Sequence, residues 1–554
     1  MNSIFRTVSF HGLLSAAVLV CLAIRPAPAE QTVRVFIFAG QSNMVGSDSR
    51  VEDIGNFPPF EGLEKPQTKV RFSYCLGREN KTRSDGWGPL QPVNRIVGPE
   101  LSFARRVTGR IADPIAIIKC AAGGTHLGGD WNPEKPEGFK MYPLAMKLIQ
   151  DSLKQLSDEG IRYRIEAVMW HQGENDMFNE QYMANYGKNL EKFVARWRKD
   201  LQSPRLPFFI GELCTKTIWG MDLRPRMYAI SRGQKYVAGK DPRVTYVPTA
   251  QIGVEIGGGV GLHYHYGTLG QLQHGENYAQ AYLASIGEGR PVSRKLEKWP
   301  YQPSETVKLF VLAGHRNMEG ERAFASQLKQ MEPERQLAAD DSTIAFKYDL
   351  GGSYRVSDGW EPLGLTGYYE TFGPELSFAR RFKQQARSPI AVAKFTHSGS
   401  QIIDWTPEGS MAKSRMLYSR FTRFVRESIE EIRARGTRVE LAGILYHVGE
   451  NDMSFYPYRK EAAKRIDALI RQSREDLQLP ELRWFVFQQP PTDDPGVNRI
   501  DVVSDIAAIL KKDPYAIHVP VMDLPPQKKK LVLDTPGVVH LGRSMADAVL
   551  SNSE

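Results

Sequence analysis

Short, mostly apolar segments alternate along the chain with longer segments in which apolar residues recur every three or four positions. The short segments are rich in valine, isoleucine and phenylalanine, which is typical of strands buried on both faces of a parallel sheet. In the first half the predicted strands are 33–39, 115–118, 167–170, 208–210 and 244–247, and the predicted helices are 100–111, 141–156 and 182–201. Strands and helices that alternate in this order predict an α/β fold with a doubly wound parallel sheet.

The chain contains this pattern twice. The segment TVRVFIFAGQSNM at 32–44 returns as TVKLFVLAGHRNM at 306–318, and the blocks SDGW, GPELSFARR and GENDM recur at offsets of 273 to 276 residues. A period this long indicates two copies of one domain and not a solenoid. We therefore predict domains at 30–290 and 306–554, joined by the polar, proline-containing linker 291–305.

The N-terminal segment predicts export. Residues 1–29 combine a basic residue, an apolar run at 13–24 and the small-residue pattern Ala27-Pro28-Ala29 of a signal peptidase site. That run is shorter than the roughly 20 residues that a membrane-spanning helix needs. No other segment is apolar enough for a membrane span, so we expect a periplasmic or extracellular protein.

Composition narrows the class of protein further. With 41% hydrophobic and 24% charged residues, the chain has an ordinary globular composition, which excludes disordered and fibrous classes. Basic residues are dispersed and no basic motif is interleaved with aromatic residues, so we expect no nucleic-acid partner. The mature chain keeps Cys75, Cys120 and Cys214, which allow at most one intramolecular disulfide. Neither a CxxC motif nor a metal-ligand spacing is present, so we expect no metal.

Ser42 is the first candidate for chemistry. It follows the first predicted strand in the turn Gly40-Gln41-Ser42-Asn43. Open α/β sheets bind ligands outside the carboxyl ends of their strands, which is where this turn lies. A serine there can present its hydroxyl to a substrate, and its own backbone N–H can stabilise an oxyanion.

Four blocks of the first domain resemble the SGNH hydrolases, specifically the sialate O-acetylesterase group and the related carbohydrate esterase family six. They are AGQSNM at 39–44, KCAAGGT at 119–125, WHQGE at 170–174 and the stretch from GQL at 270 to AQAY at 279–282. The resemblance implies a three-layer, flavodoxin-like α/β/α sandwich that removes acetyl groups from carbohydrates through an acyl-serine intermediate, without a cofactor.

The resemblance also implies roles for individual residues. His265, five residues before Gly270, is the expected base, with His263 as the alternative. The acid that usually precedes the histidine by three residues is absent, because Leu262 stands there. Glu174 is then the expected orienting acid, with Glu255 or a Ser-His dyad as alternatives.

The expected oxyanion donors are the backbone of Ser42, the glycine turn and a side-chain amide. The resemblance assigns the turn to Gly123 and Gly124 and the amide to Gln172, with Asn175 as the alternative.

The second domain lacks several of these groups. Ser42 is replaced by Arg316, Gln172 by Val448 and Gly123 by Ser398, and the position of His265 corresponds to Val532. Glu174 and Asn175 survive as Glu450 and Asn451. The sequence therefore predicts an exported carbohydrate O-acetylesterase with a degenerate second domain that has lost its activity. The alternative is a non-catalytic glycan-binding or scaffold protein derived from the same fold.

Overall fold

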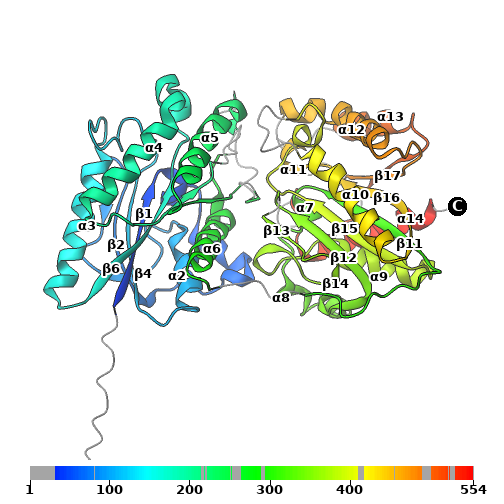
Figure 1. The fold of residues 1–554 in the computed structure, drawn as a ribbon, viewed down its shortest axis with the longest axis horizontal. Helices are drawn as coiled ribbons and strands as arrows, with labels where there is room; N and C mark the ends of the chain where they lie inside the picture. The colour runs from blue at the N-terminus through cyan, green and yellow to red at the C-terminus, as the bar shows by residue number, and fades with distance from the viewer. Residues whose placement is uncertain are drawn as a thin grey trace, which may run out of the picture.

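The computed structural model describes residues 32–79, 81–213, 217–218, 221–249, 251–252, 264–288, 294–352, 354–409, 417–453, 456–488, 501–521, 523–524 and 531–552. Each half of the chain is an α/β domain built on an eight-stranded, mostly parallel sheet (Figure 1). The predicted fold class is confirmed for both halves. The leader predicted at 1–29 lies outside the described residues.

Strand β1 (Val33–Gly40) lies at the centre of the first sheet, whose order is β10-β7-β6-β1-β5-β2-β3, with β4 paired to β2. It pairs in parallel with β5 (Ile115–Ala121) on one side and with β6 (Tyr163–His171) on the other. The remaining strands are β2 (Gln67–Leu76), β3 (Thr82–Arg83), β4 (Gly88–Leu90), β7 (Phe208–Gly211) and β10 (Val244–Val247). The chain leaves β1 toward β2 and leaves β6 toward β7, in opposite directions. The carboxyl ends of β1 and β6 therefore form the switch point where such sheets bind ligands.

Helices cover both faces of this sheet. Helices α3 (Met141–Asp158), α4 (Glu180–Asp200) and α5 (Arg224–Lys240) pack on one face, and α2 (Glu100–Thr108) and α6 (Gly267–Ser285) on the other. Alternate residues of β1 enter the two layers, with Val35 and Ile37 on one side and Phe36 and Phe38 on the other. A strand covered on both faces is apolar at most positions, which explains the pattern that predicted it; Arg34, near the start of β1, is the exception.

Shorter elements complete the first domain. They are α1 (Ser42–Val45), the two-stranded pair β8 (Thr217–Ile218) and β9 (Met221–Asp222), and the 3-10 helices η1 (Val51–Asn56), η2 (Pro58–Phe60) and η3 (Asp176–Phe178). Strand β2 was missed by the sequence prediction. It lies near the edge of the sheet and carries partly or fully exposed polar residues at Gln67, Lys69 and Arg71, so it lacks the wholly apolar pattern.

The second domain repeats this topology, with the order β13-β12-β15-β11-β16-β17-β18 and β14 paired to β12. Its strands are β11 (Thr306–Gly314), β12 (Asp341–Leu350), β13 (Arg355–Val356), β14 (Glu361–Leu363), β15 (Ile390–Thr396), β16 (Arg438–His447), β17 (Trp484–Gln488) and β18 (Ala516–Pro520). Its helices are α7 (Arg316–Glu319), α8 (Ala325–Leu328), α9 (Glu375–Ala386), α10 (Tyr418–Ala434), α11 (Glu450–Met453), α12 (Tyr456–Leu477), α13 (Asp501–Leu510), α14 (Thr535–Ser551), η4 (Glu334–Ala338), η5 (Tyr368–Glu370) and η6 (Ile402–Trp405).

A buried ion pair is common to both domains. Lys119 Nζ lies 2.7 Å from Glu100 Oε2, and Lys394 Nζ lies 2.8 Å from Glu375 Oε2. Lys119 also donates to the backbone oxygen of Val45 at 3.1 Å, so it ties α2 and β5 to the end of α1. A buried charge needs such a partner, which explains why the GPEL block and the lysine persist in both domains.

The two domains contact each other through α6 and η1–η2 of the first domain. Tyr354 donates to Asn277 Oδ1 on α6 at 2.9 Å, and Tyr369 donates to the same oxygen. Phe57 and Phe324 pack edge to face with ring centroids 6.3 Å apart. Of the segment predicted as a linker, residues 294–305 lie against the second domain, where the side chain of Tyr301 is buried.

Two further observations bear on the class of protein. Cys75 and Cys120 are paired neighbours on β2 and β5, and both are buried free thiols, whereas Cys214 lies outside the described residues. Among the helices that the structure describes, none has both the length and the apolarity needed to cross a bilayer.

Candidate active site

The turn that carries Ser42 is fixed by close backbone packing. Gly40 has φ +154°, and a Cβ on it would lie 2.0 Å from the backbone oxygen of His171, so only glycine fits there. The backbone N–H of Gln41 donates to that same oxygen at 3.0 Å, and Gln41 Oε1 accepts the N–H of Gly173 at 3.1 Å. These bonds hold Ser42 at the switch point between β1 and β6, with 8% of the residue exposed.

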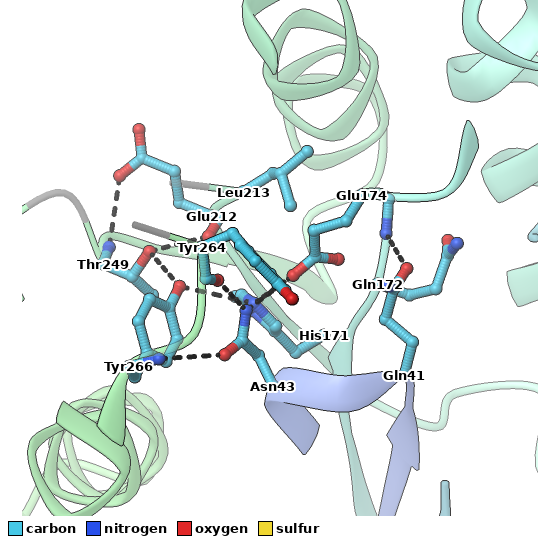
Figure 2. A network of polar contacts seen from close by, with 12 residues as sticks. Gln41, Asn43, His171, Gln172, Glu174, Glu212, Leu213, Thr249, Tyr264 and Tyr266 are labelled. Carbon is cyan, nitrogen blue, oxygen red and sulfur yellow. Dashed lines mark hydrogen bonds and ion pairs between the residues drawn. The ribbon is translucent and has the colours of Figure 1, made fainter. Parts of the chain in front are cut away.

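Asn43 connects this turn to the segment that carries His265 (Figure 2). Its Nδ2 donates to the backbone oxygen of Tyr264 at 2.9 Å, and its Oδ1 accepts the N–H of Tyr266 at 3.2 Å. The residues on both sides of His265 are thus bonded to the residue that follows Ser42. This arrangement brings the predicted nucleophile and the predicted base to the same edge of the sheet.

His265 is paired with a carboxylate that the sequence analysis did not name. Its Nδ1 lies 2.7 Å from Asp48 Oδ2. Asp48 follows α1 and has the left-handed φ of 60°. Burial lowers the pKa of His265, and the Asp48 carboxylate opposes that shift. An imidazole held through Nδ1 has its Nε2 available as a base, which is the arrangement in serine hydrolases.

No hydrogen bond joins the Ser42 hydroxyl to His265 in the part of the chain that the structure describes. Catalytic hydrogen bonds are often long in enzymes without substrate and tighten when the substrate binds.

Glu174 lies behind Asn43 and not beside His265. Its Oε1 accepts from Asn43 Nδ2 at 2.7 Å and lies 3.7 Å from His171 Nε2 (Figure 2). Burial raises the pKa of Glu174 to about 7, and the hydrogen bond from Asn43 partly opposes this. In this geometry Glu174 holds the amide that positions the histidine segment, and the bond to His265 comes from Asp48.

The predicted oxyanion groups lie close together. A Cβ on Gly123 would be 3.6 Å from Ser42 Cβ, which places the glycine turn beside the serine. A Cβ on Gly124 would be 3.7 Å from Asn175 Nδ2. Neither the Ser42 nor the Gly123 backbone N–H has a hydrogen-bond partner among the described residues.

The two candidate amides differ in their hydrogen bonds. Gln172 is fully buried, and its Nε2 donates to Thr125 O at 2.9 Å and to Asp176 Oδ2 at 2.5 Å. A primary amide has two hydrogens, so none remains for a substrate. The Asn175 amide is partly exposed and makes no hydrogen bond to another described residue. The geometry therefore favours Asn175 as the side-chain donor.

Other groups named from the sequence contribute less. His263, Leu262 and Glu255 lie outside the described residues. His171 is fully buried, and burial lowers its pKa to about 3, so it stays neutral. Within the described ranges, no three histidine, cysteine or acidic side chains are grouped so that they could hold a metal ion.

The second domain shows what replaces each group. Asn317 is hydrogen-bonded to the backbone on both sides of Val532, as Asn43 is on both sides of His265. It donates to Leu531 O at 2.9 Å and accepts the N–H of Leu533 at 2.8 Å. The match of His265 to Val532 inferred from the sequence is therefore confirmed.

Charged side chains replace neutral ones at the matching turn of the second domain, where Arg316 and Glu319 stand in place of Ser42 and Val45. Arg316 is buried in an ion pair with Glu321 at 2.6 Å. Carboxylates occupy both backbone donors, because the N–H of Arg316 donates to Glu450 at 3.0 Å and that of Ser398 donates to Glu319 at 3.1 Å.

Asp48 could have been found by the same internal comparison. The sequence comparison of the first block considered no substitution beyond Ser42. Six residues after Ser42, Asp48 aligns with Arg322 of the second domain. The alignment holds in this stretch because Gly46, before Asp48, and Gly320, before Arg322, both end a short helix in the left-handed conformation. A reversal of charge at an aligned position was the available signal.

A doubly wound sheet with a serine and a histidine–carboxylate pair at its switch point is the architecture of an α/β hydrolytic enzyme. The family model for "Carbohydrate esterase, sialic acid-specific acetylesterase" matches residues 32–284 and again residues 306–551. The chain belongs to that family, whose members are carbohydrate esterases that act on acetyl esters, and both domains carry its pattern.

Individual proteins are similar to one half of the chain. A probable carbohydrate esterase of Arabidopsis thaliana is 27% identical over 280 residues, which is 47% of this chain and 93% of that protein. Among solved structures, NanS is 16% identical, with 47% of this chain and 99% of that chain covered and a TM-score of 0.35. A carbohydrate acetylesterase from Xanthomonas citri is 16% identical, with 47% and 58% covered and a TM-score of 0.34.

Proposed function

We propose that this protein is an exported carbohydrate O-acetylesterase that works through an acyl-serine in its first domain. The observation that carries the proposal is the His265–Asp48 pair, held beside the Ser42 turn by both ends of the Asn43 amide. That arrangement supports a serine nucleophile with an oriented imidazole base.

In the first step His265 Nε2 takes the proton from the Ser42 hydroxyl while the Ser42 oxygen attacks the acetyl carbonyl carbon. The tetrahedral oxyanion is stabilised by the backbone N–H groups of Ser42 and Gly123 and by the Asn175 amide. His265 then gives the proton to the departing sugar oxygen, which breaks the ester bond. A water molecule repeats the sequence, releases acetate and restores the serine.

Asp48 and Glu174 have different tasks in this mechanism. Asp48 fixes the imidazole tautomer and stabilises the imidazolium that forms when His265 takes the proton. Glu174 holds Asn43, and Asn43 holds the backbone on both sides of His265. Glu174 is therefore a positioning residue.

The second domain is proposed to have no esterase activity. It has no serine, histidine or acid at the three matching positions, where Arg316, Val532 and Arg322 stand. The carboxylates of Glu450 and Glu319 occupy the matching backbone donors. Its contacts with α6 and η1–η2 support a role as a scaffold for the first domain.

The test is acetate release from acetylated oligosaccharides by the full mature chain. Ser42→Ala should abolish release, and Ser157→Ala on the exposed surface of α3 should not affect it. A serine-reactive phosphonate should label wild-type protein at Ser42. Release that persists in Ser42→Ala would refute the serine mechanism. A wild-type protein that binds glycans but releases no acetate would identify the binding module instead.

Export has a separate test. When the chain is expressed with its leader in a host that secretes proteins, N-terminal sequencing of the secreted protein should begin at Glu30. Protein that stays in the cell with Met1 intact would contradict this part of the proposal.

A further inference from the structure

A guanidinium group lies at the rim of the proposed acyl site. Arg78 follows β2 at the carboxyl edge of the sheet, and a Cβ on Gly124 would be 3.0 Å from Arg78 Nη1. The same position is 3.7 Å from Asn175 Nδ2, and the neighbouring Gly123 packs beside Ser42. Arg78 therefore lies next to the groups that surround the reacting carbonyl.

Among the residues that the structure describes, no carboxylate is paired with Arg78. The Arg78 side chain is exposed, with its guanidinium carbon 4.9 Å from the ring centroid of Phe139, and it forms no ion pair with a described carboxylate. Asp130 accepts the Phe139 N–H at 2.7 Å through one oxygen and bonds His126 through the other. The acid that holds Phe139 is thus already committed to other donors.

The second domain provides an internal comparison. Leu76 and Leu350 occupy matching register positions on β2 and β12, so Arg78 is matched by Gly352. The structural pair of Lys119 and Glu100 is kept in the second domain, whereas Arg78 is lost together with the catalytic groups. This pattern of loss associates Arg78 with the substrate and not with the fold.

We propose that Arg78 determines specificity by binding an anionic group, a carboxylate or a sulfate, on the sugar that carries the acetyl ester. The proposal rests on the proposed function and adds the chemical class of its substrate. Arginine presents a planar set of donors that matches both anions bidentately, and the Phe139 ring orients that plane before the substrate arrives. Because the site is open to water, we expect a preference of about tenfold for an anionic substrate.

The experiment compares two forms of one substrate with the full mature chain. Acetylated oligogalacturonide carries free carboxylates, and the same oligosaccharide with its carboxylates methyl-esterified is the neutral control. The kcat/KM for acetate release should be about tenfold higher for the acid form in wild-type protein, and Arg78→Ala should remove most of that preference. Arg78→Lys should retain part of it. Arg71→Ala removes one charge from a surface pair with Glu159 and should leave the preference unchanged.

An acetylated, sulfated oligosaccharide and its desulfated form distinguish the source of the anion. A preference for only one of the two acids identifies the group that Arg78 binds. Equal kcat/KM for every charged and neutral pair, or a preference that survives Arg78→Ala, would overturn the proposal while Ser42-dependent release continues. Absence of acetate release from all substrates would instead refute the proposed function.

Discussion

Replacing Asp48 by asparagine tests which of two carboxylates, Asp48 or Glu174, orients His265, the proposed base. The His265 Nδ1 to Asp48 Oδ2 distance is 2.7 Å, whereas the bonds of Glu174 go to Asn43. In Asp48→Asn the new side-chain amide could donate a hydrogen to Nδ1, which would put the imidazole proton on Nε2 and block the base. Glu174→Gln is the matched control, because its side-chain oxygen can still accept from Asn43.

The solvent exposure of the Asp48–His265 pair determines how far kcat is expected to fall. A hydrogen bond to a charged group contributes about 1.5–3 kcal/mol, which corresponds to roughly 10- to 150-fold in rate. The Asp48 side chain is 57% exposed, so water takes over part of its role. We therefore expect kcat to fall about 10- to 30-fold in Asp48→Asn, less than the roughly 10⁴-fold seen for a buried triad acid. Burial raises the pKa of Glu174 to about 7, so a neutral glutamine at this position resembles the native side chain. We therefore expect only a small change in kcat for Glu174→Gln.

The assay is kcat and KM for acetate release at pH 7, together with the pH profile and thermal unfolding. The Asp48 carboxylate raises the pKa of His265, so its loss should lower that pKa further and move the acidic limb of kcat/KM to lower pH. A merely structural role for Asp48 would not move this limb. A full loss of activity in Glu174→Gln with Asp48→Asn unaffected would refute the reasoning and restore Glu174 as the orienting acid.

Three further predictions concern the oxyanion donor, the base and the buried ion pair. Asn175→Ala should lower kcat about 10²-fold with little change in KM, because an oxyanion donor acts in the transition state; an unchanged kcat would return Gln172 to that role. Burial lowers the pKa of His265, and the base must be neutral, so the kcat/KM of wild-type protein should stay high down to an apparent pKa below 6.5 and fall at lower pH. Glu100→Gln should lower the unfolding free energy by about 3–5 kcal/mol in denaturant titrations, because it leaves the buried Lys119 without its charged partner. A loss below about 1 kcal/mol would contradict that assignment.

The sequence predicted the elements whose environment is uniform along their length. Strand β1 is covered on both faces, so every position except Arg34 is apolar and the strand can be predicted without further context. Strand β2 lies near the sheet edge, where part of its length meets solvent, and its mixed pattern does not separate it from a loop. The turn at Ser42 was readable because Gly40 is required by its close approach to His171.

The candidate site was predictable only where spacing along the chain fixes geometry. Ser42 falls within a matched block and His265 lies at a fixed spacing before another, whereas Asp48 contacts the imidazole from a left-handed position in a loop that no spacing rule describes. From the sequence, Gln172 was the expected side-chain oxyanion donor and Asn175 the alternative, and both carry a primary amide. They are separated by hydrogen-bond accounting, since the Gln172 amide is consumed by Thr125 and Asp176.

The hydrogen bonds of the backbone N–H groups also explain how the two domains diverged. Backbone N–H groups in a buried site need acceptors, and an unsatisfied one costs free energy. In the second domain Glu319 supplies a carboxylate to the N–H of Ser398, and Glu450 supplies another to the N–H of Arg316. The first domain has Val45 where Glu319 stands, and it leaves the matching N–H groups of Ser42 and Gly123 without an acceptor among the described residues. A fold that satisfies these donors in one domain is able to satisfy them in the other. This contrast supports the proposal that the acceptor in the first domain is the oxygen of the acetyl ester.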